Sequence, residues 1–115
     1  METFTLGVAS HEAVNTRFLD AFEGTAQGPY ITFESAELLF RVLTQRRWNI
    51  VSSTTGTAPV SIPEIARRVR RDVKAVDRDV RALLNAGIVE PTNDGSIVFP
   101  YAAVRVDFVL TAPRN

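Results

Sequence analysis

The sequence predicts an α+β domain that is mainly helical, with a small amount of β structure. Three observations lead to this prediction. Two adjacent segments with helical periodicity, residues 61–69 and 72–86, are separated by a tight turn. An Asp-Gly pair, the strongest short signal for a β-hairpin, follows them at 94–95. Alternating strand patterns lie near both ends of the chain, at 3–8 and 104–110.

The first 29 residues are expected to form a strand followed by a helix. Apolar and polar residues alternate from Thr3 to Val8, which is the pattern of a half-buried strand. Ser10 is expected to cap a helix that runs to about Phe22, because apolar residues recur there at helical spacing. We therefore assign residues 1–29 to an N-terminal strand–helix extension and residues 30–115 to the main domain.

Three short elements are expected next. Tyr30 to Phe33 is expected to form a short strand. Ser35 is expected to cap a short buried helix that reaches Leu43, and Thr44 is expected to cap a second helix from Gln45 to about Thr54. In this second helix the residues expected to face the interior are Trp48, Ile50 and Val51.

Two helices joined by a tight turn are central to the predicted domain. The first has a capping box, in which the Ser61 hydroxyl accepts from the backbone N–H of Glu64 and the Glu64 side chain reaches back. Asp72 is a good N-cap for the second helix, over about 72–86, and Gly87 suits the left-handed turn at its end. A short helix, a turn and a longer helix are typical of a helix-turn-helix.

One face of the second helix is predicted to be basic. At about 100° per residue, Lys74, Arg78 and Arg81 lie together, with Arg71 just ahead of them. Lys74 and Arg78 are four residues apart, so they repel each other by roughly 0.2–0.5 kcal/mol unless a polyanion neutralises them. The sequence therefore predicts that 72–86 is a recognition helix for the major groove of double-stranded DNA.

The distribution of charge supports this prediction although the net charge of the chain is zero. Residues 1–40 hold one basic and six acidic residues, a net charge of −5. Residues 41–81 hold ten basic and four acidic residues, a net charge of +6. Positive charge is therefore concentrated on the segment that contains the helix pair, and the local field matters more for docking than the total.

A β-hairpin is predicted directly after the helix pair. Ile88 to Glu90 and Ile97 to Phe99 are its two strands, and Asp94–Gly95 forms its turn. A hairpin in this position is typical of the wing of a winged helix. The tip, Thr92 to Ser96, has no Lys or Arg, so we expect only polar phosphate contacts from it or a purely structural role.

Several function classes lack their sequence signals. There is no cysteine, so disulfides and thiolate zinc sites are excluded, and the one histidine gives no metal-ligand spacing. We find no nucleophile motif, no Gly-rich phosphate loop and no paired catalytic carboxylates, so we predict that the protein is not an enzyme and needs no cofactor. No apolar run approaches the ~20 residues of a membrane span, and the N-terminus lacks the basic residue of a secretory signal. We expect a mature cytoplasmic protein.

Three stretches of the chain carry a family resemblance: ITFESAELLFRVLTQRRWNIV, SIPEIARRVRRDVKAVDRDVRALLNAGIVE and DGSIVFPYAAVRVDFVL. Together they resemble a prokaryotic family of small predicted transcriptional regulators of the winged-helix type, grouped loosely with MarR-like and ArsR-like regulators. The similarity covers roughly residues 30–110. It implies a cytoplasmic DNA-binding regulator, and some relatives look like antitoxins of two-gene operons, which would add a toxin protein as a partner.

Two positions depart from the pattern of these relatives. Many relatives have Gly before the equivalent of Arg71, where this chain has Arg70. A histidine often precedes the equivalent of Arg78, where this chain has Asp77. The first difference adds positive charge near DNA and the second removes some. The two differences together therefore do not predict whether this chain binds DNA more or less tightly than its relatives.

We predict DNA contacts from ten residues: Ser61, Arg67, Arg70, Arg71, Lys74, Ala75, Arg78, Arg81, Thr92 and Asn93. Arg71 and Lys74, near the helix N-terminus, are best placed for base edges or flanking phosphates, whereas Arg78 and Arg81 are expected to follow the backbone. The alternative is a solvated face on which Asp77 and Arg81 form an i,i+4 pair. Arg67 is equally consistent with the outer face of the first helix, and for Arg47 a solvated helix start is the preferred interpretation.

Partner predictions follow from the DNA interpretation. Most simple helix-turn-helix proteins bind two-fold sites as dimers, so a homodimer on double-stranded DNA is expected. The two terminal strands could pair with each other or with a second subunit. The rival hypothesis is an antitoxin or a protein-interaction winged helix whose main partner is another protein, bound through the acidic N-terminal third.

Overall fold

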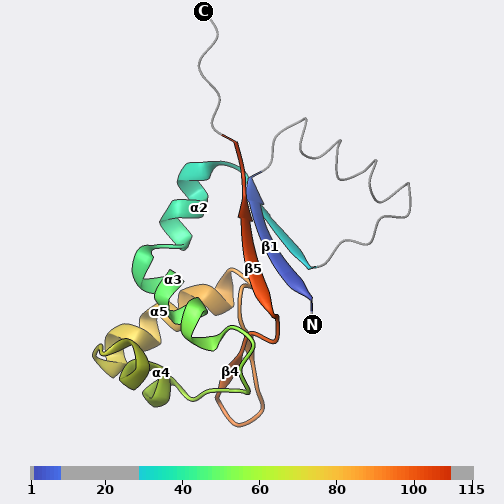
Figure 1. Cartoon of the computed structure of the whole chain (residues 1–115). Coiled ribbons are helices and arrows are strands. Elements are labelled where there is room, and N and C mark those ends of the chain that lie inside the picture. Colours follow the sequence, from blue (N-terminus) through green and yellow to red (C-terminus); the bar gives the residue numbers. More distant parts are fainter. Residues whose placement is uncertain (1, 9–28, 110–115) are drawn as a thin grey trace, which may run out of the picture.

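The computed structural model describes residues 2–8 and 29–109, and it is an α+β fold in which helices lie against a small sheet (Figure 1). The predicted helix from Ser10 to Phe22 lies outside the described residues, as does Leu110 at the end of the predicted last strand. Among the described residues, none of the helices combines the length and the apolar character that crossing a membrane requires.

A parallel three-stranded sheet joins the two ends of the described chain. It consists of β1 (Thr3–Val8), β2 (Tyr30–Phe33) and β5 (Ala103–Asp107) in the order β2-β1-β5. The three predicted strands are confirmed, and the terminal strands pair with each other within one chain. The pairing of β1 with β5 begins at Thr3↔Ala103. β1, which the sequence assigns to an extension, is thus the central strand.

The register of the sheet gives it one apolar face. Phe4 and Leu6 alternate with polar or small residues along β1, and both are buried. Residues paired across a parallel sheet point to the same side, so Val104 and Val106 of β5 join this face. The alternation predicted for the first strand therefore corresponds to a face that packs on the hydrophobic core.

Four helices are described, and all begin at the predicted caps. They are α2 (Ala36–Val42), α3 (Gln45–Thr54), α4 (Ile62–Val69) and α5 (Val73–Asn85). In each case a side-chain oxygen of the N-cap accepts from a backbone N–H of the first turn, which satisfies a donor that the helix leaves free. The four caps are Ser35, Thr44, Ser61 and Asp72.

The predicted end of α5 is also confirmed. Gly87 has a φ of 78°, the left-handed conformation that favours glycine. Its N–H donates to the carbonyl of Leu84, and the N–H of Ile88 donates to the carbonyl of Leu83, both at 3.0 Å. This pair of bonds satisfies two of the last carbonyls of the helix and turns the chain toward the hairpin.

The predicted hairpin follows, with β3 (Glu90–Pro91) antiparallel to β4 (Ile97–Val98). Ile97 also exchanges backbone hydrogen bonds of 2.8 and 2.9 Å with Val60, just before α4. The hairpin is therefore fixed to the segment between α3 and α4 as well as to the end of α5.

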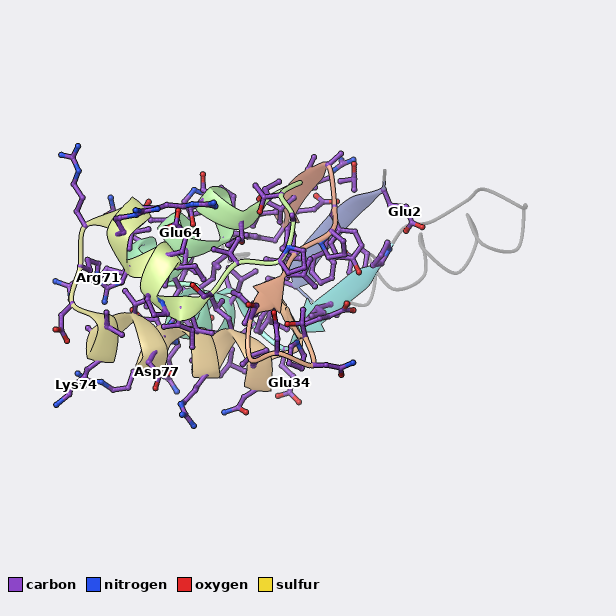
Figure 2. The ribbon with its side chains drawn as sticks, turned by 90° about the horizontal axis from the view of Figure 1, so that it is seen from below. Glu2, Glu34, Glu64, Arg71, Lys74 and Asp77 are labelled. Carbon is purple, nitrogen blue, oxygen red and sulfur yellow. The ribbon has the colours of Figure 1, made fainter. Side chains whose placement is uncertain are left out.

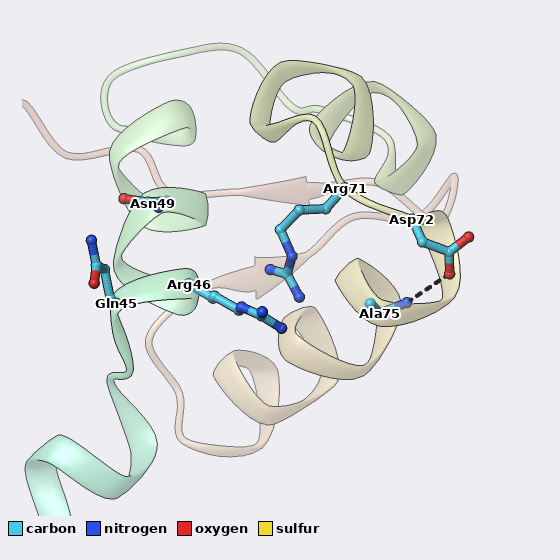
Figure 3. A pocket seen from close by; sticks show the side chains of 6 residues that line it. All are labelled: Gln45, Arg46, Asn49, Arg71, Asp72 and Ala75. Atoms are coloured by element: carbon cyan, nitrogen blue, oxygen red, sulfur yellow. Dashed lines mark hydrogen bonds between the residues drawn. The ribbon is translucent and has the colours of Figure 1, made fainter.

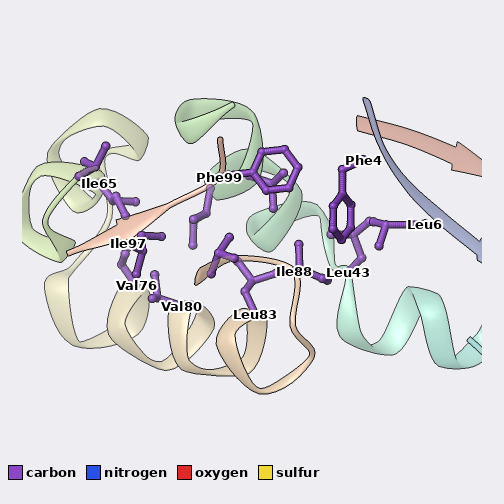
Figure 4. Packing of buried hydrophobic residues seen from close by; sticks show 14 of the residues in the cluster. Phe4, Leu6, Leu43, Ile65, Val76, Val80, Leu83, Ile88, Ile97 and Phe99 are labelled. Carbon is purple, nitrogen blue, oxygen red and sulfur yellow. The ribbon is translucent and has the colours of Figure 1, made fainter. Parts of the chain in front are cut away.

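One hydrophobic core connects the helices to the sheet (Figure 4). Val76, Val80 and Leu83 of α5 are fully buried, and the ring of Phe99 lies 5.5 Å from that of Phe4, measured between centroids. The core is thus continuous from α5 to β1.

The prediction that Trp48 faces inward is wrong. Its exposed fraction is 37%, whereas Ile50 and Val51 are fully buried as predicted. The buried stripe of α3 follows positions 47, 50, 51 and 54, and Trp48 lies about 100° from its centre. Arg47 therefore occupies the inward position that we expected an aromatic residue to hold.

The turn between α4 and α5 contains the one described non-glycine residue with a positive φ, Arg70 at 59°. A left-handed conformation costs a residue with a side chain roughly 1–2 kcal/mol. Glycine avoids this cost, but it loses more conformational entropy on folding, which offsets part of the gain. We expect Arg70→Gly to raise the free energy of unfolding by up to about 1 kcal/mol in urea denaturation. The matched control Gly87→Ala should lower it by a similar amount, and the opposite pair of signs would contradict this account.

Candidate nucleic-acid interface

The two faces of α5 differ as the sequence predicts. Its apolar face is buried in the core, while Lys74, Arg78 and Arg81 are all exposed on the opposite side. Figure 2 shows Lys74 projecting away from the body of the molecule at the start of α5. The three cations share one face of one helix because they are spaced at three and four residues.

The members of this face differ in their partners. Nε of Arg81 lies 2.8 Å from Oδ2 of Asp77, which is the i,i+4 pair that the solvated-face alternative proposes. Arg81 is 73% exposed, so this pair contributes little to stability. Within the described part of the chain, the side chains of Lys74 and Arg78 have no ion pair or hydrogen bond. These two cations therefore remain uncompensated on the outer face.

The structure turns Arg71 inward, away from the basic face on which the sequence placed it. Its Nη2 donates to Oδ2 of Asp79 at 2.8 Å, and its side chain is only 19% exposed. The reason is the turn itself: the Arg71 N–H donates to the carbonyl of Ala66, which directs the chain back toward α3 and α5. The base-edge contact expected of Arg71 is not compatible with this position.

Asp79 is shared by two arginines. Its Oδ1 accepts from Nε of Arg47 at 3.0 Å while its Oδ2 accepts from Arg71, so one carboxylate links α3, the α4–α5 turn and α5. Nη1 of Arg47 also donates to the carbonyl of Val42 at 2.9 Å, which connects the end of α2. Sequence reasoning missed this cluster. The available signal was the helical spacing of Arg47 with Ile50 and Val51, which places Arg47 on the buried side of α3.

The cluster also sets the charge state of Asp79. Burial acts to raise the pKa of this carboxyl, but the hydrogen bonds and positive charges of Arg47 and Arg71 outweigh it and hold the pKa below its ordinary value of 3.8. Asp79 is therefore ionised at neutral pH and neutralises one of the two arginines.

The arginines of α4 lie on its outer surface. Arg67 and Arg68 both pair with Glu64, and Nη1 of Arg68 donates to the carbonyl of Ser53 at 3.1 Å. The Ser61 hydroxyl accepts from the Glu64 N–H at 3.3 Å as predicted, but the Glu64 carboxylate pairs with these arginines and not with the Ser61 N–H, so only one half of the predicted capping box forms. Arg70, in the turn, is exposed.

The hairpin tip is held together by its own side chains. The Thr92 hydroxyl contacts Oδ1 of Asp94 and the carbonyl of Ser96, and Thr92 is half-buried. The pKa of Asp94 is lowered mainly by the hydrogen bond from the Thr92 hydroxyl and, to a smaller extent, by that from the Ser96 backbone N–H. Of the two predicted contacts at the tip, Asn93 is exposed and Thr92 is used within the turn.

A pocket of 540 Å³ lies between the start of α3 and the start of α5 (Figure 3). Arg71 and Ala75 line it on one side, and Arg46 extends into the same space from α3 (Figure 3). Ala75, one of the predicted contacts, is half-buried here and is not on the outer face. The full set of lining residues is Gln45, Arg46, Asn49, Arg71, Asp72 and Ala75.

Comparison with known families shows a match over the central part of the chain. The model of the family HVO_A0114 matches residues 42–106, which is more than half of the 115 residues. The matched segment includes α3, α4, α5 and the hairpin, and therefore all ten predicted contact residues. Searches of curated proteins and of solved structures found no match.

The Asp79 cluster predicts a loss of stability on substitution. Asp79→Asn would leave Arg47 and Arg71 partly buried without a counter-charge, and we expect the free energy of unfolding to fall by about 2 kcal/mol, less than for a fully buried pair. Urea denaturation measures this difference. The control Asp77→Asn removes the exposed pair with Arg81 and should cost less than about 0.5 kcal/mol. Equal effects of the two substitutions would show that the cluster adds nothing.

The same cluster predicts a pH dependence. Because the folded-state pKa of Asp79 is lowered, its contribution is complete above the unfolded-state pKa and is lost as the pH falls through the folded-state value. The stability difference between the wild-type protein and Asp79→Asn should therefore be constant near neutrality and shrink below about pH 4. Denaturation curves at a series of pH values test this, and a difference that persists in acid would refute it.

Proposed function

We propose that this chain, which belongs to the HVO_A0114 family, is a double-stranded DNA-binding transcriptional regulator of the winged-helix type. The order α3, α4, α5 and then the hairpin supports the fold assignment, as do the tight turn at Arg70 and the backbone bridge between Val60 and Ile97. In this proposal α5 is the recognition helix and the hairpin is the wing.

The observation that carries the proposal is the uncompensated charge on the outer face of α5. Lys74 and Arg78 are exposed, four residues apart and without a partner in the described chain, whereas the opposite face of α5 is buried. Two like charges at this spacing destabilise an isolated helix, and a phosphate backbone would relieve the repulsion. A helix with one buried and one cationic face fits the major groove.

The structure changes the roles that we assign to individual residues. Lys74, in the first turn, is the best-placed residue for base edges or the flanking phosphates, and Arg78 is placed to contact the backbone. Arg81 already pairs with Asp77, so its guanidinium would have to be shared between Asp77 and a phosphate. Arg71 acts as a positioning residue: through Asp79 and Arg47 it sets the orientation of α5 relative to α3.

Other predicted contacts have a supporting role. Arg70 and Arg67 are exposed at the α4–α5 turn and the end of α4, where they would meet phosphates flanking the groove. Arg46 at the start of α3 is exposed and lines the pocket between α3 and α5, where it is a candidate phosphate contact. The wing carries no cation at its tip, so we assign to Asn93 only a polar contact.

DNA binding by this face predicts a salt dependence that two substitutions should reduce. We expect Lys74→Gln/Arg78→Gln to weaken binding to a duplex from the region upstream of the protein's own gene, and to reduce the slope of log K against log salt by about 1.8, because two phosphate contacts are lost. Fluorescence anisotropy with a labelled duplex at several salt concentrations measures both quantities, and an unrelated duplex separates specific from non-specific binding.

The matched control removes the same charge elsewhere. Arg41→Gln changes one exposed residue of α2, so it should leave the salt slope nearly unchanged, whereas Arg78→Gln alone should reduce the slope by about 0.9. Equal losses in these two single variants would mean that only the total charge matters. Binding that ignores both salt and the α5 substitutions would instead favour a protein-assembly role, with a toxin-like partner as one form of it.

A further inference from the structure

The outer edge of the sheet at β5 is open in the described part of the chain. β5 pairs with β1 along one side, and among the described strands none pairs with its other side (Figure 1). Large apolar residues are exposed beside this edge: Phe40 at 58%, Val106 at 38% and Val109 at 81%. The rings of Phe40 and Phe108 lie 5.6 Å apart, so α2 and the end of β5 form one apolar surface.

We propose that β5 pairs with β5 of a second copy of this chain, antiparallel and centred on Val106. The pairing would create a homodimer with one continuous sheet, in the order β2-β1-β5-β5-β1-β2. The sheet edge lies on a different element from the cationic face of α5, so this inference stands independently of the DNA-binding proposal.

The backbone of β5 is in the correct phase for this register. The Thr5 N–H donates to the carbonyl of Pro29 beside β2, so the odd-numbered residues of β1 direct their backbone groups toward β2, and Phe4 and Leu6 direct theirs toward β5. In the parallel register that pairs Phe4 with Val104, the partners of Phe4 are the backbone groups of residues 103 and 105, so Val104 and Val106 direct theirs outward. Centring on Val106 therefore lets Val106 exchange both hydrogen bonds with Val106 of the second copy, as a hydrogen-bonded antiparallel pair requires, and it places Arg105 opposite Asp107.

Side-chain charge selects this register over its neighbour. Centring on Val106 gives two cross-strand pairs of opposite sign between Arg105 and Asp107. Centring on Arg105 would be equally compatible with the backbone, but it would place two arginines directly opposite each other. Within one chain Nε of Arg105 lies 3.9 Å from Oδ2 of Asp107, a long ion pair between two exposed side chains, so both residues can also pair with the second copy.

The same register matches the apolar face. Val106 would meet Val106 of the second copy, and Val104 would meet Phe108. Directly opposite residues point to the same side of a sheet, so the helices of both copies would lie on one face. An exposed edge strand with apolar neighbours also promotes aggregation, which pairing prevents.

Disulfide cross-linking tests the register, because the chain has no native cysteine. The two Val106 residues would form a hydrogen-bonded pair, whose Cα atoms are about 5.5 Å apart, within the range that a disulfide spans. We expect Val106→Cys to give a covalent dimer on oxidation of the full-length protein, seen on a non-reducing gel. Val104→Cys should not, since its two copies would be about 14 Å apart. Efficient cross-linking through Arg105→Cys in place of Val106→Cys would overturn the register.

Charge exchange tests the interface in the otherwise native chain. Arg105→Asp would place acidic groups opposite each other, so sedimentation equilibrium should show at least a tenfold weaker dimer. Arg105→Asp/Asp107→Arg should restore dimerisation, because opposite charges again face each other. A wild-type protein that remains monomeric at high micromolar concentration would overturn the proposal, as would a double variant no stronger than the single one. DNA binding measured with the α5 variants is a separate result.

Discussion

The position of α5 depends on one carboxylate that two arginines share. Asp79 forms ion pairs with Arg47 of α3 and with Arg71 of the α4–α5 turn, so three segments meet at one half-buried carboxylate. If either arginine moved away, the charge of the carboxylate would be less well compensated in partly apolar surroundings. Hydrophobic contacts among Val76, Val80 and Leu83 bury α5, but they are not directional. The ion cluster supplies the direction that fixes the rotation of the helix about its own axis.

The ion pairs also determine which cations on the outer face of α5 lack a counter-charge. Arg71 is occupied internally and Arg81 is paired with Asp77, which leaves Lys74 and Arg78 as the uncompensated cations. A chain with no net charge can therefore present a local positive surface, because its acidic residues are paired with arginines, used as a helix cap at Asp72, or placed elsewhere. In the proposed interface, the cations that matter are those that lack partners on the outer face of α5.

Local signals predicted most of the secondary structure. The caps at Ser35, Thr44, Ser61 and Asp72 and the glycine at position 87 act within a few residues, so the sequence alone was sufficient to place them. The Asp79 cluster could not be placed in this way, because Arg47 and Asp79 are 32 residues apart and meet only after α3 has packed on α5. The pairing of β1 with β5 was one of two alternatives that the sequence left open, and its pairing with β2 was not predicted, because strand alternation identifies a strand but not its neighbours.

The partnership of β1 with β5 has a consequence for how the chain is made. Residues 3–7 pair with residues 103–107, so the central strand waits until residues 103–107 have been synthesised before its second neighbour exists. Contacts among α3, α4 and α5 join segments much closer in sequence and form earlier and faster. During translation the helical part would therefore emerge from the ribosome and assemble first, and the sheet would be completed only after β5 has emerged.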